Sequence, residues 1–483
     1  MGVAKSNVTA PKRLILAASI AAVCGGLAAP AYADMETLLD KLRAKGVLSE
    51  EEYQEMRTDV RAERREKALK EAQETEKAAK KAEGAATELT GRFKDGFSWE
   101  SGDKENAIAL SGRIHADYRQ FDVNSGAGTT GTANSANTFD VRRAYLGVSG
   151  RVANDWTFEV VADVAQGTNG GTSFAQAMDV AWVNWGAYRG VQLRAGQFKM
   201  PMALEELTSS RFIDFTERSY VDQLAPAKER GAMIHGSPFT GVFYGVAASN
   251  GNGKNNNETT SVTDGKDIIG RLGANFAEII GNKDMVLHVA GAYSDGQQAA
   301  GSVPSGRTEG RGIQFFTGPA IATEYDRKRT AAEVSLAWNQ FKLQGEMLNA
   351  NFKTTTGTLT DRDIDTSYAE AMWLITGEKY ADAYRNGAYG AIKPNRAFKK
   401  GTDGWGAWEL GLRYSKWDAG DFATTATSAN GADAVTVGLK WIPNTNTRVY
   451  LNYIQTKFDQ PINVVGGTAD EEKAINMRLA LYF

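Results

Sequence analysis

The last stretch of the chain, NMRLALYF (Asn476–Phe483), carries the strongest signal of the fold. Successive side chains of an extended strand point to opposite faces, so alternate residues of this stretch share a face. One face is apolar and holds Met477, Leu479, Leu481 and Phe483. A strand of this kind that runs to the terminal residue suits a barrel closing in a lipid bilayer, because closure leaves no unpaired sheet edge in lipid.

The composition agrees with a large β structure. Among 483 residues there are 51 glycines, only 10 prolines, and 10 tryptophans with 17 tyrosines, which suits twisted strands, tight turns and aromatic rims. The formal net charge is −3, so the chain lacks the global basic footprint of a nucleic-acid-binding protein.

The N-terminus has the pattern of a secretory signal peptide, predicted over residues 1–33. Lys5, Lys12 and Arg13 precede the apolar run LILAASIAAVCGGLAA, and AYA places small residues before a cut after Ala33. A membrane anchor is the alternative, but the apolar run is short; a lipoprotein cut before Cys24 would follow Val23, a poor residue for that step. The mature chain is expected to be exported and to contain no cysteine.

Residues 34–90 are predicted to be a periplasmic helical region. METLLDKLRAKGVLSEEEYQEM reads as two short helices, with Gly46 ending the first, and Ser49 and Glu52 forming a capping box for the second. The charged stretch that follows predicts a longer helix, either in a short coiled coil between copies or as a solvated single helix or tether.

Residues 91–483 are predicted to form an outer-membrane β-barrel domain. Alternating segments such as WTFEVVAD and RVYLNY give sixteen antiparallel strands, joined by short turns on one side and by long loops, among them 459–471, on the other. The connection 376–404 is the exception, because it is long on the short-turn side. A soluble β-sandwich or solenoid is the alternative, but aromatic residues gather at the short-turn ends, as in an interfacial girdle: Trp156, Trp185, Tyr188, Trp338, Trp373 and Trp441.

Several motifs resemble the phosphate-selective porin O and P family. They are AGQFKMPMALEELTSSRFIDFTERSYVDQLAPAKERG (195–231), FDVRRAYLGVSGRV (139–152), and WLITGEKY with the following GAWELGLRYS (within 373–415). The terminal RLALYF resembles the C-terminal signal read by the outer-membrane insertion machinery. The resemblance covers roughly residues 91–483. It implies a sixteen-stranded homotrimeric channel in Gram-negative outer-membrane lipid, whose third external loop, here 199–228, folds into the lumen and narrows it.

The resemblance also implies an anion channel for phosphate or related oxyanions, lined by arginine and lysine. Arginine suits this task because its planar fork holds two oxygens at once. On the predicted inward face, cationic side chains outnumber acidic ones, while the loop 199–228 has mixed charge. The residues expected to contact the solute, in the lumen and the constriction, are Arg113, Arg143, Arg194, Arg211, Arg218, Lys228, Arg230 and Arg271.

The sequence carries no pattern of an enzyme or of a cofactor site. The three histidines, His115, His235 and His288, fall on different strands, with no spacing typical of a metal site or a triad. DRDIDTS (361–367) resembles the opening of a calcium loop, but Thr366 and Met372 stand where that loop needs glycine and glutamate. The predicted function is therefore a passive porin. The alternative is a structural tether from the outer membrane to peptidoglycan through residues 34–90, with a general diffusion pore.

Overall fold

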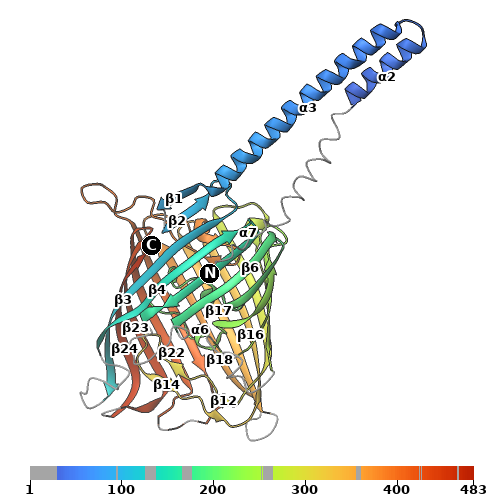
Figure 1. Cartoon of the computed structure of the whole chain (residues 1–483). Coiled ribbons are helices and arrows are strands. Elements are labelled where there is room, and N and C mark those ends of the chain that lie inside the picture. Colours follow the sequence, from blue (N-terminus) through green and yellow to red (C-terminus); the bar gives the residue numbers. More distant parts are fainter. Residues whose placement is uncertain are drawn as a thin grey trace, which may run out of the picture. The chain divides into compact units, whose positions relative to one another are not determined.

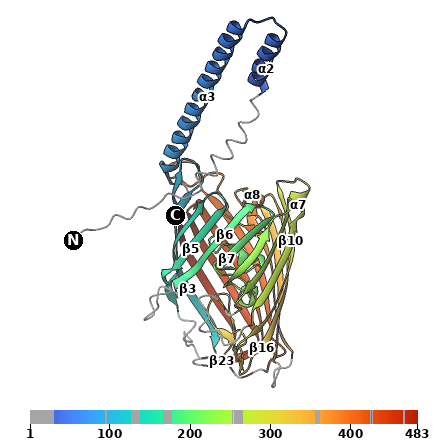
Figure 2. The same cartoon turned by 45° about the vertical axis from the view of Figure 1, so that its right-hand side comes forward.

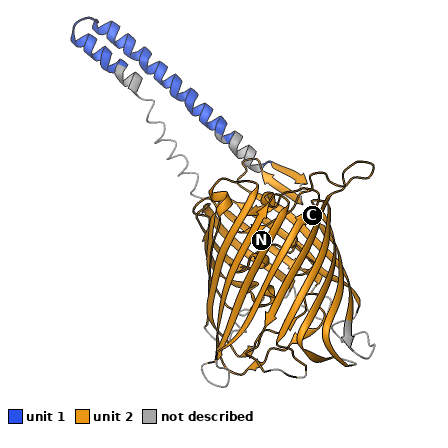
Figure 3. Cartoon of the chain, turned by 180° about the vertical axis from the view of Figure 1, so that it is seen from behind, with its two compact units in different colours: residues 1–88 blue, residues 89–483 orange. Residues whose placement is uncertain are grey.

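The computed structural model describes residues 30–93, 96–125, 137–165, 177–251, 253, 265–354, 361–423, 425, 427–464 and 467–483. Its contacts divide the chain into two compact units, residues 1–88 and 89–483 (Figure 3). The predicted signal peptide lies almost wholly outside the described residues, which begin at Pro30. The predicted boundaries at 33 and 90 stay predictions.

The first unit is a helical hairpin of α2 (Pro30–Ala44) and α3 (Glu50–Thr87). Ser49 and Glu52 cap α3 reciprocally: the Ser49 amide donates to the Glu52 carboxylate at 2.9 Å, and the Glu52 amide donates to the Ser49 hydroxyl at 3.2 Å. Tyr53 is buried in the hairpin and donates to Asp40 at 2.5 Å. No helix in the described part of the chain is long and apolar enough to cross a membrane.

The second unit is built on one antiparallel sheet (Figures 1 and 2). Of its eighteen strands, β1 (Leu89–Phe93) and β2 (Phe97–Ser101) form a ribbon beside the others. The remaining sixteen strands, which form the barrel wall, are β3 (Ala107–Ser125), β4 (Thr138–Val152), β5 (Trp156–Asp163), β6 (Met178–Tyr188), β7 (Val191–Lys199), β8 (Lys228–Gly236), β9 (Val242–Ser249), β10 (Asp267–Asn275), β11 (Met285–Gln298), β16 (Tyr325–Trp338), β17 (Phe341–Thr354), β18 (Arg362–Leu374), β21 (Ala407–Asp418), β22 (Gly431–Asn444), β23 (Thr447–Val464) and β24 (Gly467–Tyr482).

The last strand closes the barrel on the first. β24 pairs with β3 from Ala469 opposite Ser125 to Tyr482 opposite Arg113. At the end of the chain the Phe483 amide and carbonyl both bond to the backbone of Gly112, at 3.1 and 2.7 Å. The prediction of a closed sixteen-stranded barrel ending in NMRLALYF is therefore confirmed.

The two faces of the wall differ as the alternation predicts. Along β16, Arg327, Arg329 and Glu333 are buried inside the barrel, whereas Val334, Leu336 and Trp338 are exposed on its outer face. Across the short-turn end, exposed aromatic side chains stack in neighbouring pairs, among them Phe341 with Trp373. The outer face is thus apolar and the inner face polar, the reverse of a soluble barrel.

One predicted loop is shorter than expected. Residues 459–471 read as a long loop, but β23 continues to Val464 and β24 begins at Gly467. Ile462 pairs with Ala469, and both are buried on the inner face. The outward residues of this extension are polar, so the sequence lacks the alternation that predicts a strand. A strand that extends beyond the apolar, lipid-facing band of the barrel does not need apolar residues on its outer face.

Three of the connections that the structure describes lie inside the barrel. The first lumen loop (200–227, with α5, Leu204–Leu207, and α6, Val221–Leu224) and the second lumen loop (299–324) enter from the long-loop end. The inner connection (375–406) enters from the short-turn end and holds α8 (Tyr380–Ala383), β19 (Tyr384–Arg385) and β20 (Ala388–Tyr389). The smaller elements elsewhere are α7 (Phe276–Ile279) at a turn, and β12 (Gly301–Ser302), β13 (Gly306–Arg307), β14 (Gln314–Phe316) and β15 (Ala320–Ile321) in the second lumen loop.

Candidate pore site

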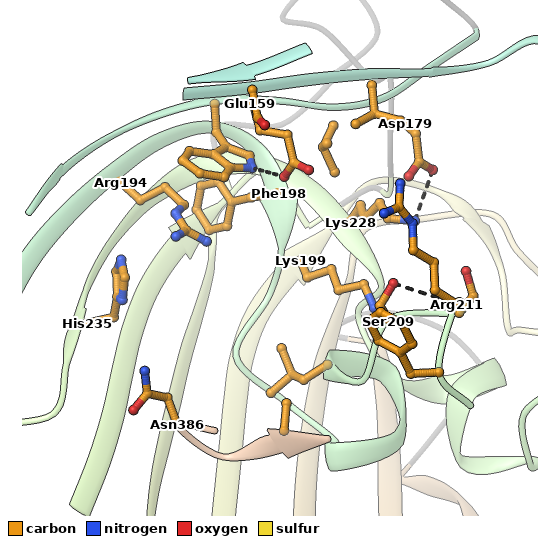
Figure 4. Close-up of a pocket in the computed structure, with 18 of the residues that line it drawn as sticks. Glu159, Asp179, Arg194, Phe198, Lys199, Ser209, Arg211, Lys228, His235 and Asn386 are labelled. Atoms are coloured by element: carbon orange, nitrogen blue, oxygen red, sulfur yellow. Dashed lines mark hydrogen bonds and ion pairs between the residues drawn. The ribbon is translucent and has the colours of Figure 1, made fainter. Parts of the chain in front are cut away.

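A cavity of about 850 Å³ lies between the first lumen loop and the wall from β3 to β10 (Figure 4). Its lining is strongly cationic. Among the described residues, two acids line it, Glu159 and Asp179, against nine cations: Arg113, Arg143, Arg189, Arg194, Lys199, Arg211, Arg218, Lys228 and Arg271. A cationic cavity with low-dielectric walls concentrates anions.

Four of these arginines have no carboxylate within ion-pair distance in the described part of the chain: Arg113, Arg189, Arg194 and Arg211. The aromatic wall holds two of them in place. The Arg113 guanidinium lies 3.9 Å from the ring centre of Tyr145 and donates to the Ser210 hydroxyl at 2.5 Å. The Arg194 guanidinium lies 4.2 Å from the ring centre of Trp182, and its Nε atom is buried without a hydrogen-bond partner.

The two acids of the cavity are already engaged. Asp179 accepts from Lys228 Nζ at 2.9 Å, and Glu159 accepts from the Trp182 indole at 3.1 Å (Figure 4). The Glu159 contact fixes the indole that stacks against Arg194. Consequently the acids orient the cationic lining rather than cancel it.

The first lumen loop separates its charges. Three of its acids pair with cations of the wall strands that do not line the cavity: Glu205 lies 3.1 Å from Arg413, and Asp214 lies 2.6 Å from Lys342. Glu217 pairs with Arg142 and Arg478, both at 2.8 Å. A loop of mixed charge in the sequence is therefore predominantly cationic where it faces the cavity.

The loop also pairs charges within itself. Arg218 lies 2.8 Å from Glu206, and Lys199, at the end of β7, lies 3.6 Å from the same residue. Burial raises the pKa of the Glu206 carboxyl, but Arg218 and Lys199 outweigh burial and hold that pKa below its usual value. The Arg211 side chain has no such partner, and burial lowers its pKa from the usual value. An anion entering the cavity would supply the missing countercharge.

Hydrogen bonds fix the first lumen loop to the far wall. The amides of Leu204 and Glu205 both donate to the Glu346 carboxylate at 2.7 Å, and the Thr216 amide donates to Asn452 at 2.7 Å. Buried backbone donors seldom go unpaired, so these acceptors determine where the loop crosses the lumen.

The second lumen loop narrows the barrel on the long-loop side. Glu309 accepts from Arg413 at 2.7 Å and from Thr436 at 3.1 Å. Glu472 of β24 accepts from the Thr308 hydroxyl at 2.6 Å and from the Ile313 amide at 2.7 Å. The loop is thus attached to two separate parts of the wall.

The inner connection narrows the barrel from the short-turn side. Tyr380 donates to Glu409 at 2.5 Å, Tyr384 bonds His288 at 2.7 Å, and Arg271 donates to the Gly387 carbonyl at 3.0 Å. Its basic residues Lys393, Arg396, Lys399 and Lys400 are solvent-exposed. The cavity passes between this connection and the wall, since Asn386 and Gly387 also line it.

The structure brings together seven of the eight residues that the sequence analysis selected. Arg113, Arg143, Arg194, Arg211, Arg218, Lys228 and Arg271 line one cavity. Arg230 does not line it and instead donates to Gln197 at 3.4 Å. Arg271 already has an ion-pair partner, because its guanidinium lies 2.6 Å from the Glu333 carboxylate. Contact of any of them with a solute stays a prediction.

Sequence reasoning missed Arg142, Arg189 and the aromatic supports Tyr145 and Trp182. Arg142 and Arg143 are neighbours in the sequence, yet the side chains of both are largely buried. This is possible because the pairing of β3 with β4 shifts by one residue next to His115. Strict alternation assigns only one of two neighbours to the lumen. The doubled arginine in FDVRRAYL is a signal that could have pointed to the shift.

No group of histidine, cysteine or acidic residues that could hold a metal ion occurs within the described ranges. The acidic stretch 361–367 lies at the start of β18. There Asp363 and Asp365 accept from Asn351 and Asn349 at 2.9 and 3.0 Å, on the outer side of the wall.

A closed sixteen-stranded barrel with an apolar outer face, a polar lumen and loops folded inward is the architecture of a membrane channel of the porin class. A family model described as phosphate-selective porin O and P matches residues 108–483, so the chain belongs to that family. It is an outer-membrane porin of Gram-negative bacteria.

The relatives span most of the chain. Porin O of Pseudomonas aeruginosa is 25% identical over 407 residues, which is 77% of this chain and 88% of the relative. Among solved structures, the Vibrio cholerae OmpT with loop L8 deleted has a TM-score of 0.49 at 12% identity and covers 78% of this chain and 100% of its own. The outer membrane channel DcaP of Acinetobacter baumannii has a TM-score of 0.48 at 10% identity, and the match covers 78% of this chain and 97% of the DcaP chain.

Proposed function

We propose that this porin passes small oxyanions, with phosphate as the leading solute. The observation that carries the proposal is the segregation of charge in the lumen. Nine cations and two acids line the cavity, while acids of the first lumen loop pair with the opposite wall. The family description, phosphate-selective, supports the same solute class.

Transport of this kind needs no covalent step. An oxyanion is attracted into the cavity by its field and is held by unpaired guanidinium groups, whose planar forks match two oxygens at once. The solute leaves because it exchanges one weak site for the next along the wall. The residues proposed to hold it are Arg113, Arg194 and Arg211, with Arg143 and Lys228 adding field and Arg218 and Arg271 positioned by their own carboxylates.

The test is a planar-bilayer measurement of purified protein under a potassium chloride gradient, followed by phosphate. An anion-selective reversal potential with phosphate blocking the chloride current supports the proposal. Arg211→Gln should weaken the block, whereas Arg230→Gln, which removes a charge outside the cavity, should not. A cation-selective potential, or equal effects of both substitutions, would overturn it.

We also propose that residues 1–33 are removed on export, that residues 34–90 lie in the periplasm, and that the porin assembles as a homotrimer. A second role for residues 34–90, contact with peptidoglycan or a coiled coil between copies, is favoured by one observation. The α2–α3 hairpin is a packed element rather than a bare tail, with Leu39 and Tyr53 buried and Arg43 over the Tyr53 ring.

A further inference from the structure

The ribbon of β1 and β2 extends the barrel sheet at its short-turn end. β2 pairs with β3 from Phe97 opposite Leu110 to Glu100 opposite Ala107. This is the edge of β3 that β24 leaves free, because β24 ends with Tyr482 opposite Arg113. The ribbon thus continues the wall at the level where the closing strand stops.

The two faces of the ribbon differ in polarity. One face carries Leu89, Phe93, Phe97 and Trp99, all exposed, and the Phe93 and Phe97 ring centres are 4.8 Å apart. The opposite face is polar: Glu100 lies 3.9 Å from Arg92 and 3.0 Å from Arg151 of β4. Polar contacts therefore hold one face, while the described residues leave the aromatic face uncovered.

The aromatic face is continuous with the outer face of the barrel. Trp99 is opposite Ile108, Ile108 opposite Gly150, and Gly150 opposite Phe158. Directly opposed residues of antiparallel strands point to the same side of a sheet. The aromatic row of the ribbon therefore joins the row of apolar side chains that the barrel presents to lipid.

Two physical arguments place this face at the surface of the bilayer rather than in its centre. A contiguous exposed apolar face is unfavourable in water, so this broad aromatic face needs a covering medium. Yet β1 pairs only with β2 among the described strands, and an unpaired strand edge is costly in hydrocarbon. The headgroup level satisfies both demands, since phenylalanine and tryptophan rings bind there while water reaches the edge.

We propose that the aromatic face of the β1–β2 ribbon binds the headgroup region of the periplasmic leaflet. The ribbon is then a lipid-bound collar at the start of the barrel. Along the chain, only Glu88 separates β1 from the end of α3.

The test uses the full chain in vesicles, with the single cysteine, Cys24, replaced by serine. A bimane-type fluorophore is attached through Phe93→Cys on the aromatic face. The matched control is Arg92→Cys, the next residue along, which is similarly exposed but lies on the polar face. Folding of each variant is checked by the heat-dependent mobility of the barrel, and Leu89→Cys with Thr90→Cys provides a second pair.

The proposal predicts that lipids brominated near the headgroup quench the Phe93→Cys label at least about threefold more than the Arg92→Cys label, and more than deeply brominated lipids do. Equal, weak quenching of both labels, with both open to iodide, would overturn it. Protection of the Phe93→Cys label from iodide without quenching by lipid would also overturn it and would indicate cover by protein, such as a second copy.

Discussion

The guanidinium of Arg194 stacks 4.2 Å from the ring centre of Trp182, and the Trp182 indole in turn donates to Glu159 at 3.1 Å. This arrangement orients an arginine by an aromatic face instead of a carboxylate. A carboxylate partner would neutralise the charge and occupy the fork, whereas the ring leaves both available. The same device holds Arg113 over Tyr145.

Arg194 is expected to matter for its fork as well as its charge. Arg194→Gln should weaken phosphate block by roughly 10- to 100-fold, since a hydrogen bond to a charged group contributes about 1.5–3 kcal/mol. Arg194→Lys should fall between wild type and Arg194→Gln, because it keeps the charge but loses the planar fork. Titration of single-channel current with phosphate measures both. If the lysine variant matches wild type, the fork plays no part.

Arg413 is expected to hold the lumen loops in place. It lies between Glu205 of the first lumen loop and Glu309 of the second, at 3.1 and 2.7 Å. Arg413→Met leaves two buried carboxylates without their partner, and breaking such a pair costs about 3–5 kcal/mol. The variant should show larger, noisier single-channel conductance and a lower unfolding temperature.

Lys416→Met is the matched control, because Lys416 lies on the same strand and pairs with Asp418 at 3.1 Å on the half-exposed outer face. A surface pair of this kind contributes about 0–1 kcal/mol, so conductance should stay unchanged. Equal noise in both variants would show that Arg413 does not restrain the loops.

Gly196 is expected to be irreplaceable in β7. Its φ is +125°, and a Cβ atom there would lie 2.2 Å from the Ala181 carbonyl oxygen of β6. Gly196→Ala should lower the free energy of unfolding by about 1–3 kcal/mol from backbone conformation alone, with the clash adding to it. Urea unfolding in lipid vesicles measures this.

Gly270→Ala serves as its control, because a Cβ atom at Gly270 meets no atom within 4 Å. That variant should unfold like wild type. A stable Gly196→Ala protein would mean that β6 and β7 separate locally without cost.

The parts of the fold and of the cavity that the sequence predicts are those with a regular repeat of residues. Alternation gave the faces of the long strands, and the terminal strand gave the closure, because a period of two repeats along every strand. The burial of Arg142 beside Arg143 could not be read, since one register shift breaks the alternation. The pairing of Glu205 and Asp214 with cations of the wall was equally hidden, because a loop has no period.

The helical unit and the ribbon are expected to have different roles, which two deletions can distinguish. Deleting residues 34–88 should leave the anion selectivity and phosphate block of the barrel unchanged, because every described residue that lines the cavity lies at or after Gly96. Deleting residues 34–101 removes the ribbon as well, exposes the edge of β3 beyond Tyr482, and should lower the yield of folded barrel in vesicles. Planar-bilayer recordings and heat-dependent mobility measure the two effects.

A loss of selectivity in the shorter deletion would place the helical unit in the conduction path, whereas normal folding of the longer deletion would show that the ribbon is dispensable for closing the barrel. Envelope leakage in cells that carry the shorter deletion, with conductance intact, would instead support the tethering role of residues 34–90.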